Sequence, residues 1–161
     1  MKKVAVFILL FVTCGCAEQT TEDIISTGDV AEISTISVYS VGRNWDADAE
    51  DDGIVININF YNRDHEIIYF KEHEFYVTIR IYTTVYDENF NAQKGRLVYE
   101  NTFEMTSSIQ IDDFWGKGLE IPFTEIKTRA DDDQFGIMEV TVEIPGVGMY
   151  YGVDEFTQLY P

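Results

Sequence analysis

Beyond residue 33 the apolar residues recur at every second position, and no other feature of the chain constrains its fold as strongly. The period is clearest over residues 54–60, 75–81 and 138–144, where isoleucine, valine and phenylalanine alternate with mainly polar residues. Strands with one buried face show this alternation, because successive side chains point to opposite faces of a sheet. The β-branched and aromatic residues of these runs also suit a pleated, half-buried surface. The sequence therefore predicts an all-β fold.

Shorter runs with the same composition fill the gaps between these three segments. They cover residues 34–41, 66–70, 96–105, 108–111, 119–123 and 150–159. Turn-forming residues separate them, which makes about seven to nine short strands and predicts an antiparallel β-sandwich of two sheets. The expected architecture is immunoglobulin- or fibronectin-like. Membership in the immunoglobulin family is not predicted, because its Cys–Trp–Cys core signature is absent.

The N-terminus has the composition of an export signal. Lys2 and Lys3 precede an unbroken apolar run over residues 4–12, and the small residues around Gly15 follow. A positive start, a short apolar segment and a small-residue cleavage site make a secretory signal, and this apolar run is too short to span a bilayer.

The Gly15-Cys16 ending resembles the lipobox of prokaryotic lipoproteins. The resemblance implies that Cys16 is lipid-modified and becomes the first mature residue, so that the protein is held in the cell envelope on the extracytoplasmic side of a membrane. We therefore expect a signal peptide over residues 1–15, a polar tether over residues 16–32 and a sandwich domain over residues 33–161. Cys14 and Cys16 are the only cysteines, so the domain itself has none for a disulfide. A bridge between these two thiols is the alternative to lipidation.

The charge of the chain narrows the classes of partner. Its formal charge is −18, with all acidic residues beyond Cys16. A field of this sign repels phosphate backbones and anionic headgroups, so nucleic-acid binding is disfavoured, whereas cations and basic partners are favoured.

One acidic segment lies between two expected strands and ends at Gly53. It holds five carboxylates: Asp46, Asp48, Glu50, Asp51 and Asp52. Alternating carboxylates on a flexible loop suit Ca²⁺, which prefers hard oxygen ligands. The segment departs from an EF-hand, because Asp51 occupies the position of the invariant glycine and no helices flank the loop. The alternative is a solvated acidic turn.

Two arrangements of residues 66–86 lead to different metal sites. If they form one bent strand, the acidic loops over residues 46–52, 87–91 and 131–133 lie at one end of the sandwich and can build a composite cation site. If residues 66–70 form a separate strand, these loops part. The sequence leaves both arrangements open.

No motif indicates catalysis. A Gly-x-Ser-x-Gly elbow is absent, and the spacing of His65 and His73 fits no zinc arrangement.

Tyrosines at outward positions favour a flat face for a protein or carbohydrate partner. They are Tyr76, Tyr82, Tyr86, Tyr99, Tyr150 and Tyr151.

We therefore expect a non-enzymatic lipoprotein that acts in binding, adhesion or envelope assembly. A Ca²⁺-dependent recognition module that uses the acidic loop is the first alternative, and calcium is the only cofactor in view. An envelope hydrolase with scattered carboxylates is the second alternative.

Overall fold

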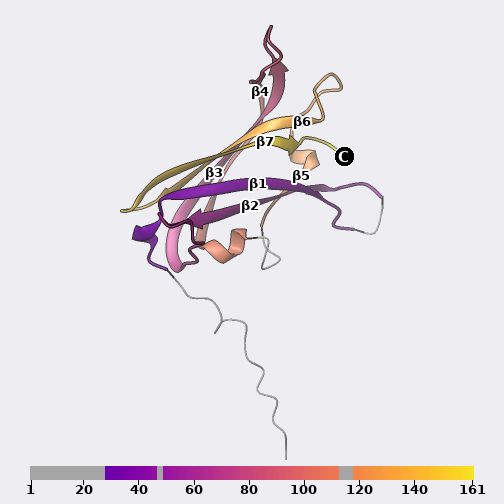
Figure 1. Ribbon diagram of the computed structural model, residues 1–161. Helices are drawn as coiled ribbons and strands as arrows, with labels where there is room; N and C mark the ends of the chain where they lie inside the picture. The colour runs from indigo at the N-terminus through magenta and orange to yellow at the C-terminus, as the bar shows by residue number, and fades with distance from the viewer. Residues whose placement is uncertain (1–27, 47–48, 113–117) are drawn as a thin grey trace, which may run out of the picture.

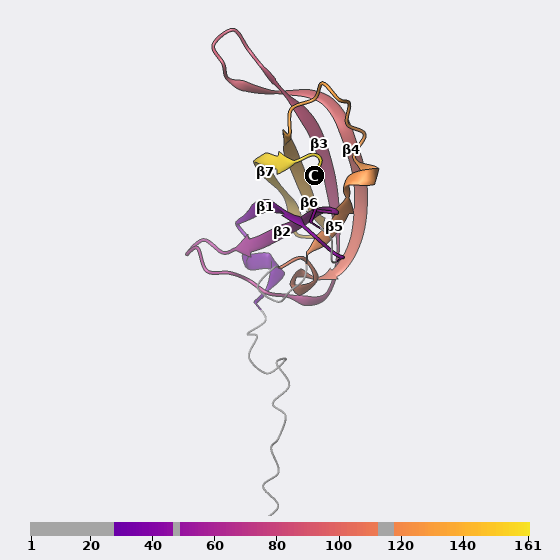
Figure 2. The same ribbon diagram turned by 90° about the vertical axis from the view of Figure 1, so that its right-hand side faces the viewer.

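The structure is a computed structural model that describes residues 28–46, 49–112 and 118–161. The expected signal peptide, Cys16, the tether as far as residue 27 and Asp48 lie outside the described residues. Two antiparallel sheets stack in a sandwich-like arrangement, which confirms the all-β prediction (Figures 1 and 2). In the described part of the chain, no helix is long and apolar enough to cross a bilayer.

The smaller sheet has three strands in the order β1-β2-β5. Its strands are β1 (Thr35–Arg43), β2 (Gly53–Tyr61) and β5 (Leu119–Pro122). Strand β2 is buried on both faces. Ile54, Ile56, Ile58 and Phe60 face the core, whereas Val55 and Asn57 are buried on the outer side. Gly118, just before β5, lies so close to Val55 that a Cβ there would approach its Cγ1 to 2.3 Å.

The larger sheet has four strands in the order β4-β3-β6-β7. Its strands are β3 (Lys71–Tyr86), β4 (Ala92–Ser107), β6 (Phe135–Ile144) and β7 (Gly148–Gln158). The predicted alternation is seen clearly on β3, where Phe75, Val77, Ile79 and Ile81 are fully buried. The residues between them face the outside of the sandwich and are only half-buried.

Among the described residues, three short 3-10 turns connect or precede the strands: η2 (Val30–Glu32), η3 (Ser108–Ile111) and η5 (Phe123–Glu125). The expected strand over residues 108–111 is wrong, because this segment forms η3. A capping box at Ser107 ends β4 and begins η3. The Ser107 hydroxyl accepts from the Ile109 amide at 3.3 Å, and the Gln110 side-chain oxygen accepts from the Ser107 amide at 3.2 Å.

The expected strand over residues 66–70 is also wrong. Ile67, which pairs with Tyr61, and Tyr69 form isolated bridges but no strand, and the chain then enters β3. Residues 71–86 therefore form the one long strand of this region.

At one edge the two sheets meet along β1 and β7. The Asp154 carboxylate on β7 accepts hydrogen bonds from the Ser40 amide at 2.8 Å and from the Ser40 hydroxyl at 2.6 Å. A Cβ at Gly152 would lie 2.3 Å from Val38 Cγ2, so the Val38 side chain packs directly against the backbone of Gly152. Side-chain contacts thus close this edge of the sandwich in place of a continuous ladder of backbone hydrogen bonds.

The hairpin of β3 and β4 projects from the body of the sandwich (Figures 1 and 2). Its tip lies at the end of the molecule opposite to Gly28, where the described chain begins.

Candidate functional site

The acidic loop between β1 and β2 makes hydrogen bonds of its own. The Asp52 carboxylate accepts from the amides of Trp45 and Asp46, at 2.5 and 3.2 Å. Asp46, Glu50 and Asp51 lie in the same described loop, whereas Asp48 lies outside the described residues. Calcium binding here stays a prediction.

The composite cation site was expected if residues 66–86 form one bent strand, and the structure has one long strand there, β3, which begins at Lys71. The acidic side chains of the three loops nevertheless do not form one cluster among the described residues. Asp87 lies at the tip of the projecting hairpin, while Asp132 pairs with Arg96 at 2.6 Å. Within residues 28–46, 49–112 and 118–161, no three acidic or histidine side chains form a group that could hold a metal ion.

The outer face of the four-stranded sheet presents polar and aromatic side chains from all four of its strands. We call it the sheet face and define it by residues from four strands: Glu100, Thr102 and Glu104 of β4; Glu74, Tyr76, Thr78, Arg80 and Tyr82 of β3; Glu139, Thr141 and Glu143 of β6; and Met149, Tyr151 and Val153 of β7. All of these side chains are exposed or half-buried.

Strand register aligns the sheet face in rows. Across one row, Thr102, Thr78, Thr141 and Tyr151 are successive partners, and the hydroxyls of Thr78 and Thr102 lie 3.0 Å apart. Three of the four residues in this row are therefore threonines with short, polar side chains. Along β7, Met149, Tyr151 and Val153 are each at least half exposed and give the face an apolar border.

Two ion pairs occupy one half of the sheet face. Arg80 Nε lies 2.7 Å from Glu100 Oε1, and Lys94 Nζ lies 2.7 Å from Glu139 Oε1. Lys94 also sits 5.2 Å from the centre of the Tyr82 ring, within range of a cation–π contact. The hydrogen bond to Glu139 raises the pKa of Lys94 above its ordinary value.

Tyr76 occupies the other half, between Glu104 and Glu143 on the neighbouring strands. Its hydroxyl donates a hydrogen bond to Glu74. That bond and the negative charge of the three carboxylates raise the pKa of Tyr76.

The expected tyrosine face forms only in part. Tyr76, Tyr82 and Tyr151 lie on the sheet face, and Tyr86 is exposed on the hairpin. Tyr99 and Tyr150 instead point inward. Burial raises the pKa of both phenols, and the Tyr150 hydroxyl donates to the Ile33 carbonyl at 3.2 Å.

The tip of the hairpin between β3 and β4 exposes the aromatic ring of Phe90. Phe90 is 87% exposed and has φ of 62°, in the left-handed region that few side chains other than glycine adopt. Asp87 holds the turn, since its carboxylate accepts from the amides of Asn89 and Asn91 at 2.8 and 2.9 Å. Hydrogen bonds from the side chain and the backbone of Asn91 lower the pKa of Asp87.

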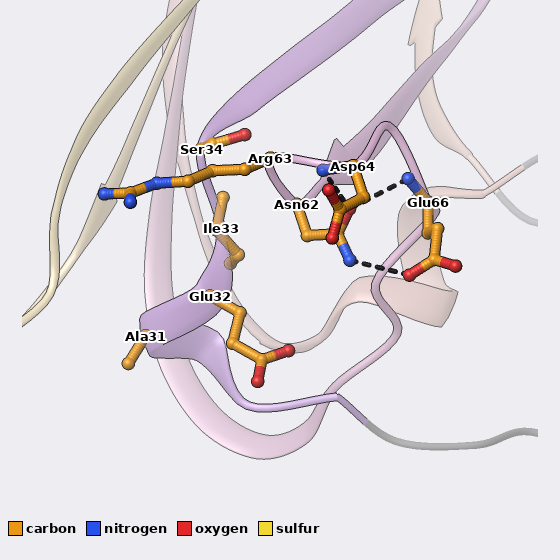
Figure 3. A pocket seen from close by; sticks show the side chains of 8 residues that line it. All are labelled: Ala31, Glu32, Ile33, Ser34, Asn62, Arg63, Asp64 and Glu66. Atoms are coloured by element: carbon orange, nitrogen blue, oxygen red, sulfur yellow. Dashed lines mark hydrogen bonds between the residues drawn. The ribbon is translucent and has the colours of Figure 1, made fainter.

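A pocket of about 870 Å³ opens between η2 and the turn after β2 (Figure 3). In that turn the Asn62 side chain accepts from the amides of Asp64 and Glu66 and donates to the Glu66 carboxylate, each at 2.9 Å. Arg63 extends away from the carboxylates of Glu32 and Glu66 (Figure 3). Hydrogen bonding within the turn therefore accounts for the polar groups of Asn62.

Sequence reasoning missed Glu74 and Glu104 as neighbours of Tyr76. The alternating period predicts which side chains point outward, but it does not tell which strands pair.

No protein-family model matches the chain, and a search of curated proteins finds no significant match.

Proposed function

We propose that this protein is a non-enzymatic lipoprotein, anchored through Cys16 on the extracytoplasmic side of a membrane, that binds a partner through the sheet face. The observation that carries the proposal is the row of Thr102, Thr78, Thr141 and Tyr151, which crosses all four strands without a buried side chain.

The composition of the sheet face also supports a binding role. Tyrosine offers an apolar ring with a polar tip at a low entropic cost, and such residues are enriched at interfaces. Threonine hydroxyls and paired charges add hydrogen-bonding groups that a partner can match. The anchor itself is supported by the lipobox-like ending at Gly15-Cys16.

Site-specific photocrosslinking in the native host tests the binding surface. A benzoylphenylalanine at Tyr151 should form a discrete adduct in intact cells. The matched control places the same group at Tyr39, an exposed tyrosine on the outer side of β1 in the other sheet. An adduct at Tyr39 with none at Tyr151 would contradict the proposed surface.

The anchor has a separate test. The native protein should have an intact mass that begins at an acylated Cys16, and Cys16→Ser should release it from the membrane fraction. A polypeptide that begins at Met1 without a lipid would contradict this part of the proposal.

A further inference from the structure

The two halves of the sheet face differ in how their carboxylates are neutralised. On the half around Tyr82, Glu100 and Glu139 each pair with a cation of the chain, Arg80 and Lys94. Lys94 also lies over the Tyr82 ring. The protein thus supplies both the cation–π contact and the counter-ions there.

The half around Tyr76 has the same kinds of acceptor without a cation. Glu104 and Glu143 flank Tyr76 across the strands, and Glu74 bonds its hydroxyl. No lysine or arginine in the described part of the chain lies within ion-pair distance of these three carboxylates. Glu104 and Glu143 lie on the two strands that flank β3, and Glu74 lies on β3 itself. Three carboxylates this close together repel one another, and a cation from outside would reduce that repulsion.

We propose that the sheet face docks a basic segment of a partner protein, whose lysine or arginine side chain lies over Tyr76 between Glu104 and Glu143. This inference rests on the proposed function and names the partner class of the same surface. The rest of the segment lies along the threonine row toward the apolar border formed by Met149, Tyr151 and Val153.

Charge complementarity selects this occupant over two others. A second copy of the chain carries the same formal charge of −18, so face-to-face pairing would add repulsion. An anionic lipid surface is repelled for the same reason. An ammonium or guanidinium group gains from both the carboxylates and the aromatic ring.

The test measures binding of a synthetic peptide of alternating lysine and threonine, about ten residues long as in a long strand. Titration calorimetry at low salt compares the wild type with the triple variant Glu74→Gln, Glu104→Gln and Glu143→Gln. The matched control removes three exposed carboxylates elsewhere: Glu120→Gln, Asp131→Asn and Asp133→Asn. Thermal melts check that both variants are folded.

We expect the face variant to lose affinity by about tenfold or more and the control by less than about threefold, because close charges act more strongly than screened distant ones. Tyr76→Leu should weaken binding by about threefold through loss of the cation–π contact. Because the acyl chain at Cys16 inserts into any bilayer, the wild type should bind phosphatidylglycerol vesicles no better than neutral phosphatidylcholine vesicles.

Equal losses in the two triple variants would overturn the inference, since they would mean that only the overall field attracts the peptide. Absence of peptide binding, or stronger binding to the anionic vesicles than to the neutral ones, would overturn it as well. If the Tyr151 crosslink still forms in those cases, the proposed function stands and only the basic partner class fails.

Discussion

At the residue scale, Asn57 is the polar side chain least compatible with its surroundings. It is fully buried on β2, and neither its amide nitrogen nor its carbonyl oxygen has a hydrogen-bond partner among the described residues. A buried amide without partners costs free energy, because its hydrogen bonds to water are lost and not replaced.

We predict that Asn57→Val raises the free energy of unfolding by about 1 kcal/mol, since it removes this desolvation penalty and suits a strand. Urea unfolding of the variant measures the change. Asn59→Val, at a half-buried position of the same strand, should change stability by less than about 0.5 kcal/mol. A loss of stability in Asn57→Val would show that its amide is hydrogen-bonded after all.

A second prediction concerns Asp87 at the hairpin tip. The Asn91 side chain makes the largest contribution to lowering its pKa below the ordinary value of 3.8. A lowered pKa in the folded protein means that the charged carboxylate stabilises the turn above the ordinary pKa. That stabilisation is lost as the pH falls through the folded value.

Titration of the Asp87 carboxyl by NMR tests this cause. Asn91→Ala should bring the pKa of Asp87 back toward 3.8, whereas Asn89→Ala should leave most of the depression, because Asn89 contributes only a backbone amide. An unchanged pKa in Asn91→Ala would assign the effect to the backbone of the turn.

At the element scale, the Asp154 carboxylate of β7 accepts two of the hydrogen bonds that join β7 to β1. Asp154 holds both the amide and the hydroxyl of Ser40, and it also accepts from the Phe156 amide at 3.0 Å. β1 and β7 are the edge strands of their sheets, so this contact satisfies an edge amide and joins the sheets at once.

We predict that Asp154→Ala lowers the free energy of unfolding by about 2–3 kcal/mol, because hydrogen bonds to a charged group are removed and the Ser40 amide loses its partner. The neighbouring exposed Glu155→Ala should cost less than about 0.5 kcal/mol. In a double-mutant cycle with Ser40→Ala the losses should not add. Full additivity would show that the two residues do not act as a pair.

At the scale of the whole molecule, the excess of negative charge opposes folding. The full chain has a formal charge of −18, whose like charges repel one another, and the described lysines and arginines form few ion pairs with them. Salt screens such long-range repulsion, since the Debye length falls from about 30 Å at 0.01 M to about 8 Å at 0.15 M.

We predict that this change in sodium chloride raises the Tm by about 4 °C, which corresponds to about 1 kcal/mol for a domain of this size. Tetramethylammonium chloride should produce the same rise, because screening does not depend on the kind of cation. A rise with sodium alone would indicate specific cation binding instead. A fall in Tm with both salts would contradict the prediction.

The sequence alone determined the all-β class and the core-facing side chains of β2, β3 and β6, but Tyr99 and Tyr150 were wrongly expected to face outward. Phe75, Val77, Ile79 and Ile81 were assigned to the core correctly, because the alternation of side chains along a strand is local and needs no knowledge of its neighbours. Local pattern failed at residues 66–70 and 108–111, where short apolar runs look alike in a strand, a bridge and a 3-10 turn.

Only the tertiary structure decided which side chains meet. Tyr76 lies between Glu104 and Glu143, and Asp154 reaches Ser40, although these residues are far apart in the chain. Strand order and register bring them together, and both are set by packing and hydrogen bonding over the whole sandwich. A shift of one residue in register would exchange the faces of a strand, so no local pattern contains this information.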